Sequence, residues 1–359
     1  MDKNILILST QYPHCGGAAT FAYDLHNYLQ KNNINSKCIF FVNNIISEKL
    51  LDPYKYGNIY MFKRNEINKY LNKLKTILEN IDCIFAINYG VISIIKNLFN
   101  KKIIYISTGS PELTLGEDCP INNNISYMKY MNDNNNNFKI IRNNKNYKSI
   151  VDSSFTIIGT NDSKNLYHKI FPELINKMQV IFSLELLINI DKFNLNKKIS
   201  YNNLDKKIDL IAIASSWDRK VKNVKLLYNI FQKYPKFNKV IIGKSSLYNF
   251  NEIENTIFIE NIANYKVLEY LKNSKIIIIP SFFESACITL VEGLSQKCKI
   301  ITSKNVGLSY LLPDEYICND IYDINEWILN IDKIYKVNNL EYNIPDYSKI
   351  NIFQDIFKL

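Results

Sequence analysis

The clearest chemical pattern in the sequence is a pair of glutamates, Glu284 and Glu292, with seven residues between them. A continuous apolar run ends at Pro280, a short loop presents Glu284, and a helical pattern begins near Ser285. The amino end of a helix has unpaired N–H groups and a positive dipole end, so it can receive a phosphate without a cationic side chain. Glu284 would then reach hydroxyl groups beyond the phosphates, and Glu292, two turns down the helix, would accept from a vicinal diol. The alternative is an ordinary amphipathic helix with two surface carboxylates.

A cationic segment follows another apolar run, at residues 211–223. Arg219, Lys222 and Asn223 lie where this segment passes into a helical pattern. Two fixed cations beside a departing diphosphate would stabilise its negative charge, each by roughly 3 kcal/mol. The alternative is a short basic run that is solvated.

Together these segments resemble the retaining GT-B glycosyltransferases of the family-4 type. The family signature is a Pro-Ser pair, a glutamate, seven residues and a second glutamate, and it matches from Pro280 to Glu292. The Lys-Asn pair at Lys222 matches the family's basic loop. The resemblance implies that Lys222, Arg219 and Glu284 are catalytic. It also implies that Glu284 contacts the donor sugar, that Glu292 binds the ribose, and that the amides between them hold the diphosphate. The other implied donor-binding positions are Ser216, Ser285, Ala286, Cys287, Ile288 and Thr289.

The loop around Gly16 and Gly17 resembles the family's amino-terminal glycine-rich loop, which lies across the donor phosphates and the acceptor. It stands after the first apolar run and before the first helical pattern, and its glycines permit close backbone approach. The resemblance therefore includes Gly16 and Gly17 among the donor-binding residues. It also implies an acceptor side, for which the candidates are His14, Asn88, Ser107 and Thr108. For His14, an ordinary loop histidine is the alternative.

The sequence departs from the family pattern at several positions. Cys287 stands where relatives commonly have Gly, and Lys297 and Lys299 replace the Gly and the Pro before the next strand. The usual spacing would put the arginine of the basic loop at Trp217 rather than at Arg219. These departures support a second hypothesis, a catalytically inactive GT-B-like protein that binds a nucleotide sugar or a partner.

Apolar runs alternate with helical patterns along both halves of the chain, which predicts parallel sheets with helices on both faces. A polar stretch at 191–207 separates the two alternations. The predicted fold is therefore α/β, with two tandem Rossmann-like, doubly wound domains (GT-B) facing each other across a cleft. We expect an acceptor-side domain at 1–195, a nucleotide-sugar-binding domain at 196–345, and a closing helix at 346–359 that returns toward the first domain. Ligands of such sheets bind at the carboxyl ends of the strands, so the chemistry is expected there.

Composition excludes several classes of protein. The chain has 359 residues, of which 47% are hydrophobic, and no apolar run is long enough to span a membrane. Its 7 cysteines form no CxxC pair and no Asp-x-Asp occurs, so neither a zinc site nor the metal motif of the other main glycosyltransferase fold is expected. The net charge of +10 is uneven, with 10 basic and 3 acidic side chains in residues 201–250. Such concentration favours specific anionic ligands over general nucleic-acid binding.

Together with these observations, the resemblance implies a cytoplasmic, metal-independent hexosyltransferase without a bound cofactor. It would move a hexosyl group, with retention, from a nucleoside diphosphate sugar to a glycan or lipid hydroxyl, with a UDP sugar favoured as the donor. A third hypothesis is nucleic-acid binding through the basic first half, although no nucleic-acid partner is expected. Residues 62–81 form an amphipathic helical pattern, which packs either on a membrane surface, as a peripheral contact, or on the rest of its domain.

Overall fold

The chain divides into two compact units, with the boundary at residues 188 and 189, inside helix α8 (Ser183–Phe193). The computed structural model describes residues 3–10, 17–43, 58–87, 90–107, 145–159, 171–181, 183–193, 198–202, 206–260, 262–284 and 287–344, with a few single residues between and beyond these ranges. The domain boundary at residue 195 remains a prediction. The predicted closing helix at 346–359 lies outside the described residues, apart from Ile356.

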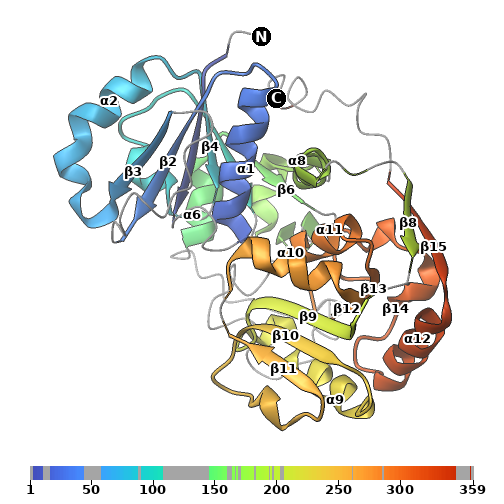
Figure 1. The fold of residues 1–359 in the computed structure, drawn as a ribbon. Helices are drawn as coiled ribbons and strands as arrows, with labels where there is room; N and C mark the ends of the chain where they lie inside the picture. The colour runs from blue at the N-terminus through green and yellow to red at the C-terminus, as the bar shows by residue number, and fades with distance from the viewer. Residues whose placement is uncertain are drawn as a thin grey trace. The chain divides into compact units, whose positions relative to one another are not determined.

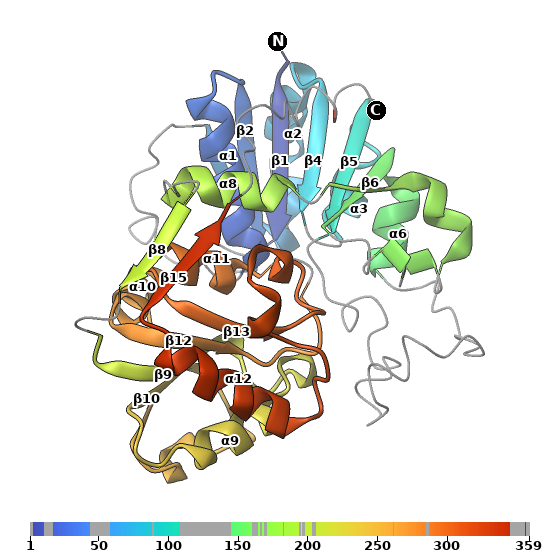
Figure 2. The ribbon, with the colours of Figure 1, turned by 90° about the vertical axis from the view of Figure 1, so that its right-hand side faces the viewer.

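The N-terminal unit is built on a parallel sheet of 7 strands in the order β3-β2-β1-β4-β5-β6-β7. The strands of this sheet are continuous apolar runs in the sequence because helices cover both faces of a parallel sheet. Residues 5–8 and 83–87 are accordingly buried throughout. Helix α1 packs against β1 and β2, as Figure 2 shows. The strands are β1 (Ile5–Thr10), β2 (Ser36–Val42), β3 (Ile59–Lys63), β4 (Cys83–Ile87), β5 (Lys102–Ser107), β6 (Phe155–Ile158) and β7 (Met178–Val180). The helices include α1 (Gly17–Lys31), α2 (Leu71–Glu79), α3 (Ile92–Ile95) and α6 (Lys145–Asp152).

The segment predicted as one helix at 62–81 is divided in the structure. Phe62 belongs to strand β3, a 3-10 segment follows as η2 (Arg64–Tyr70), and α2 begins only after it. The apolar side chains Leu74, Leu78 and Ile81 are buried in the N-terminal unit. The second half of the face considered for membrane contact therefore packs inside the N-terminal unit, whereas Ile67, Tyr70 and Leu71 are half-exposed. Within the described parts of the chain, no helix combines the length and the apolar character needed to cross a bilayer.

The C-terminal unit contains a parallel sheet of 6 strands in the order β11-β10-β9-β12-β13-β14. Helices α10 (Asn264–Lys272) and α11 (Ile288–Ser295) lie on one face of this sheet, and α9 (Val224–Lys233) and α12 (Ile324–Lys336) lie on the other (Figure 1). The strands are β9 (Ile208–Ser216), β10 (Lys239–Lys244), β11 (Thr256–Ile259), β12 (Ser274–Ile279), β13 (Lys299–Ser303) and β14 (Ile317–Cys318). Two parallel sheets with flanking helices confirm the predicted fold class.

A small antiparallel sheet joins β8 (Lys198–Asn202) to β15 (Asn339–Asn343). The first of these strands lies in the polar stretch at 191–207, where the sequence predicts no strand. Ile199 is paired with Tyr342, and both side chains are buried. One apolar residue among polar ones is too weak a pattern to predict a strand, and here the pairing with a distant segment decides the structure.

Asparagine occupies backbone positions that usually favour glycine. Among the described residues other than glycine, those with positive φ are Asn33, Asn58, Asn223, Asn255 and Lys297. The left-handed conformation costs most residues about 1–2 kcal/mol, and asparagine adopts it more readily than most. In a chain of 359 residues with only 10 glycines, asparagine therefore takes over part of glycine's role. Lys297 follows the C-cap of α11, where relatives commonly have glycine, so this departure concerns the end of a helix.

Several lysines of the C-terminal unit stabilise the carboxyl ends of helices. The Nζ atom of Lys206 donates to the carbonyls of Gln296 and Lys297, at 2.9 and 2.8 Å, just after α11. Lys299 is buried and donates to the carbonyl of Ile334, at 2.8 Å, in the last turn of α12. The last carbonyls of a helix lack backbone partners and carry negative dipole charge, which a cation satisfies. Burial lowers the pKa of Lys299 to about 8. Part of the basic charge of this unit is therefore structural.

Replacing Lys297 with glycine should stabilise the protein. Glycine adopts a φ of 54° without strain, although it adds entropy to the unfolded chain, and the net gain should be about 0.5–1 kcal/mol. The Lys297→Ala variant is the control, because it removes the charge and keeps the Cβ atom. Urea denaturation monitored by circular dichroism would measure both. Equal stability of the Gly and Ala variants would contradict the prediction.

Candidate active site

Three loops meet at the carboxyl edge of the C-terminal sheet, after β9, β12 and β13. The backbone N–H of Phe282 donates to the carbonyl of Val221 at 2.8 Å, which ties the second loop to the first. The third loop is tied to the second through Glu284, whose N–H donates to Asn305 at 3.3 Å and whose carbonyl accepts from Gly307 at 2.9 Å. Because β9, β12 and β13 are neighbours in a parallel sheet, their following loops are brought together.

Lys222 and Glu284 form an ion pair within this group of loops. The Nζ atom of Lys222 contacts Oε1 of Glu284, and their side chains are 14% and 17% exposed. The hydroxyl of Ser281 donates to the same carboxylate oxygen at 2.8 Å. Removal of most water strengthens such a contact relative to one at an open surface. Two of the three residues predicted to be catalytic are therefore brought into direct contact.

Lys222 is positioned by a short turn and a left-handed residue. It ends η6 (Lys220–Lys222), and Asn223 then takes φ 51° and ψ 49° as the N-cap of α9. Val221, in the middle of the turn, is buried, and its side chain fixes the turn to the core. The Lys-Asn pair of the sequence thus has a structural basis, because asparagine accepts the backbone conformation that follows the lysine.

Trp217 is part of the core, at the position where relatives would carry the arginine. Its ring is 1% exposed and its Nε1–H donates to the carbonyl of Ile242 at 3.1 Å. Gly243 lies against it with a φ of 132°, and a Cβ atom there would fall 1.9 Å from the carbonyl oxygen of Ala214. Arg219 stands in the same loop as Lys222, partly exposed, as the N-cap residue of η6. Its part in catalysis remains a prediction.

Asp218 connects this loop to the one after β10, a contact that sequence reasoning did not find. Its carboxylate accepts from the backbone N–H groups of Ser246 and Leu247, at 2.7 and 3.1 Å. The hydrogen bond from the Ser246 N–H is the main cause that lowers the pKa of Asp218. Ser216, a predicted donor-binding residue, accepts from the Asp218 N–H at 3.3 Å and so belongs to the same loop structure. A single aspartate after a predicted strand does not indicate that its partners lie in another loop.

Helix α11 begins at Ile288, later than the predicted start near Ser285. Cys287 is its N-cap residue, and Thr289 lies in its first turn. Ser285 and Ala286 lie outside the described residues. Glu292 is therefore about one turn, not two, from the helix start, and it is 6% exposed. Its contact with a ribose stays a prediction.

Cys287 lies within electrostatic range of all three charged residues of the predicted site. Burial raises the pKa of its thiol to about 12, and the charges of Glu284, Lys222 and Glu292 also act on it. The charges of the two glutamates and the lysine thus all reach one buried thiol. The thiol itself is protonated at neutral pH and is not a nucleophile.

Residues 194–349 match the family model described as "Glycosyl transferases group 1". This part of the chain is a glycosyl transferases group 1 domain. The match covers the ion pair, the loops around it and α11. It confirms the resemblance that the two glutamates and the Lys-Asn pair suggested. No curated protein matches the chain by sequence.

Solved structures that are similar over nearly the whole chain include several glycosyltransferases. An α-glucosyltransferase in complex with UDP and a 13-mer DNA containing an HMU base has a TM-score of 0.61 at 12% identity, with 100% of this chain and 99% of that chain covered. Anabaena HepE in complex with UDP-glucose has a TM-score of 0.59 at 11% identity, with 93% and 90% covered. The lipopolysaccharide outer core galactosyltransferase WaaB has a TM-score of 0.58 at 16% identity, with 93% and 91% covered. At these identities the likeness shows the fold.

The N-terminal candidates are only partly described. His14, Gly16, Asn88 and Thr108 lie outside the described residues. Gly17 is the exposed first residue of α1. Ser107 is buried at the end of β5, and its hydroxyl is 2.8 Å from the hydroxyl of Tyr167. The donor and acceptor roles of these residues stay predictions.

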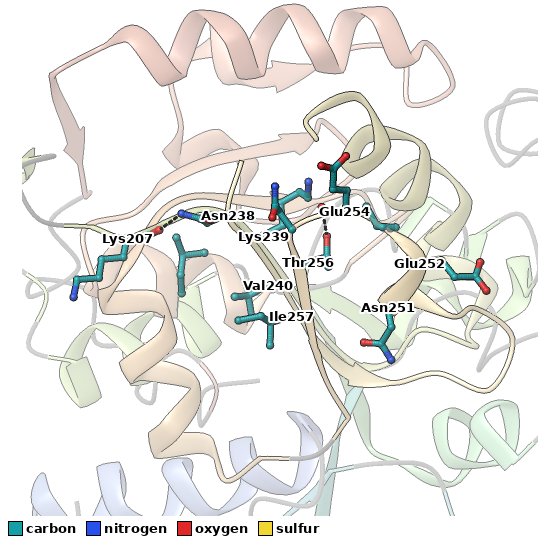
Figure 3. A pocket seen from close by; sticks show the side chains of 12 residues that line it. Lys207, Asn238, Lys239, Val240, Asn251, Glu252, Glu254, Thr256 and Ile257 are labelled. Atoms are coloured by element: carbon teal, nitrogen blue, oxygen red, sulfur yellow. Dashed lines mark hydrogen bonds between the residues drawn. The ribbon is translucent and has the colours of Figure 1, made fainter. Parts of the chain in front are cut away.

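A hollow of about 580 Å³ lies at the opposite edge of the same C-terminal sheet (Figure 3). It is lined at the amino ends of β9, β10 and β11, by residues that include Ile208, Lys239 and Thr256. The ion pair of the glycosyl transferases group 1 domain lies beyond the carboxyl ends of its strands, so this hollow is separate from it. Among the described residues, no group of three or more His, Cys, Asp or Glu side chains is arranged to hold a metal ion.

Replacing Gly243 with alanine should destabilise the domain. The new Cβ atom would collide with the backbone of Ala214 at a φ that alanine rarely adopts, at a cost of about 3 kcal/mol. The control is Leu247→Ala, in the following loop, where the side chain is 69% exposed. Urea denaturation of the three proteins would measure the change. A Gly243→Ala protein as stable as the control would contradict the close approach of β10 to β9.

Cys287 should resist alkylation in the folded protein. Its thiol is buried and its pKa is about 12, so almost no thiolate is present at pH 8. Treatment with iodoacetamide followed by peptide mass spectrometry should find Cys287 unmodified in the native protein and modified in urea. Rapid labelling of Cys287 in the native protein would show that the start of α11 is open to solvent.

Proposed function

We propose that the protein is a retaining hexosyltransferase that uses a nucleoside diphosphate sugar and transfers the sugar to a glycan or lipid hydroxyl. The observation that supports it best is the Lys222–Glu284 ion pair at the carboxyl edge of a glycosyl transferases group 1 domain. A UDP sugar is the first donor to test, because two of the similar structures contain UDP or UDP-glucose. The WaaB likeness, to a lipopolysaccharide galactosyltransferase, makes a lipid-linked glycan a reasonable acceptor class.

In the proposed reaction the acceptor hydroxyl attacks the anomeric carbon on the face from which the diphosphate departs. Because attack and departure occur on the same face, the configuration is retained. The acceptor's proton passes to an oxygen of the departing phosphate. Lys222 and Arg219 stabilise the charge that develops on the leaving group. Glu284 orients the sugar through its hydroxyl groups, Glu292 accepts from the ribose, and Gly16 and Gly17 cover the donor. Since the lysine and the arginine supply positive charge, we propose that no metal ion is required.

Replacing Lys222 or Glu284 with alanine should lower turnover by about two orders of magnitude, because charge stabilisation or sugar orientation is lost. Release of free sugar and nucleotide from a panel of UDP, GDP and ADP sugars would measure it. Lys225→Ala is the matched control, since that lysine is exposed on α9 close to Lys222 in sequence. Full activity of the Lys222→Ala and Glu284→Ala proteins would contradict the assignment.

The inactive-binder hypothesis makes a different prediction for the same panel. A protein that binds but does not transfer would be stabilised by a nucleotide sugar, by about 2.7 kcal/mol at a ligand concentration of one hundred times Kd, and would release no sugar. DNA containing an HMU base should be tested as an acceptor together with the nucleotide sugars, because one similar structure holds such a DNA and this chain has a net charge of +10. Transfer to that DNA would replace the glycan or lipid acceptor in the proposal.

A further inference from the structure

One oxygen of Glu284 receives two hydrogen-bond donors, and this has a consequence for how a diphosphate is bound. Lys222 and Ser281 both donate to Oε1. Within the described part of the chain, no hydrogen bond to Oε2 of Glu284 is present. A carboxylate has room for about four donors, so Oε2 can accept from a ligand's hydroxyl groups while Oε1 is held by the protein.

The ammonium group of Lys222 is needed in two places. The proposed function assigns it to the diphosphate of the donor, yet in the ligand-free protein it neutralises Glu284. A diphosphate that approaches Lys222 also approaches the negative charge of Glu284, which opposes its binding. We propose that the diphosphate and Glu284 compete for Lys222, an inference that rests on the proposed function. In this competition Ser281 is a positioning residue that holds the carboxylate of Glu284 while the Lys222 side chain moves.

Ser281 is built to stay in place during such an exchange. It is 3% exposed, and its carbonyl accepts from the hydroxyl of Ser303 at 3.3 Å. The backbone of Glu284 is fixed independently, by its hydrogen bonds with Asn305 and Gly307. Lys222, in contrast, holds its charge on a flexible four-carbon chain. The carboxylate is therefore the fixed partner and the lysine is the mobile one.

The competition has a catalytic use. An ammonium group already paired with Glu284 stabilises the intact donor only weakly, because the diphosphate is still bonded to the sugar and carries less negative charge than the leaving group. It stabilises the leaving diphosphate more strongly as negative charge builds up in the transition state. Interactions that strengthen only in the transition state raise turnover rather than ground-state affinity. The same competition weakens the hold on the nucleoside diphosphate product and favours its release.

The Glu284→Gln variant tests the competition directly. It keeps the shape of the side chain and removes the charge, so UDP should bind about tenfold more tightly while sugar transfer falls. The control is Glu254→Gln, which makes the same charge change at an exposed position at the amino edge of the sheet. Isothermal titration with UDP, GDP, ADP and inorganic pyrophosphate measures affinity. Equal or weaker diphosphate binding by Glu284→Gln, with both variants folded by circular dichroism, would overturn the competition.

A double-mutant cycle tests the role of Ser281. Ser281→Ala should lower kcat for donor hydrolysis about tenfold, and should have no further effect in a Glu284→Gln background, since Ser281 acts only through the carboxylate. Independent, additive losses would show that Ser281 acts in another way and would overturn its positioning role. A wild-type protein that binds none of the four ligands and hydrolyses no nucleotide sugar would instead overturn the proposed function. The two failures are therefore distinguishable.

Discussion

The contact between Lys222 and Glu284 depends on the order of strands in a parallel sheet. The two residues are 62 positions apart in sequence, and they meet because β9 and β12 are neighbours whose carboxyl ends lie at one edge. Two neighbouring elements support this contact. The loop after β13 fixes the backbone of Glu284 through hydrogen bonds. Helix α11 starts so close to the ion pair that the charges of Lys222 and Glu284 both affect the pKa of Cys287. The parallel sheet thus brings two charged residues that are remote in sequence into direct contact.

The glycines that the chain retains include positions where a Cβ atom would meet close neighbours. Asparagine or lysine serves where only a left-handed φ of 51° to 58° is needed. Glycine remains at Gly243 and Gly293, where a Cβ atom would fall 1.9 Å from a carbonyl oxygen and 2.2 Å from the Cδ1 atom of Ile277. These two glycines let β10 approach β9 and let α11 lie directly on β12. Departures from the glycines of relatives are therefore compatible with an intact site wherever only backbone conformation is concerned.

The sequence predicted the elements whose signal is local and strong. Continuous apolar runs predicted the buried parallel strands, and the fixed spacing of Glu284 and Glu292 predicted that both would lie near the start of one helix, which they do. It did not predict β8 and β15, whose few apolar residues act only through each other. Nor did it predict that Trp217 is a core residue or that Asp218 binds the loop after β10, because both partners are more than twenty positions away. The hydrogen bond from Ser281 to Glu284 is local, but a serine three residues before a glutamate is too common a pattern to predict it.

The most direct measurement of the central claim is a crystal structure of the protein with a bound nucleoside diphosphate. The account predicts that the Nζ atom of Lys222 lies about 2.8 Å from a phosphate oxygen, at charge-assisted hydrogen-bond distance, while Glu284 keeps its contact with the Ser281 hydroxyl. A diphosphate bound away from the carboxyl edge of this sheet, with Lys222 still paired to Glu284, would contradict it.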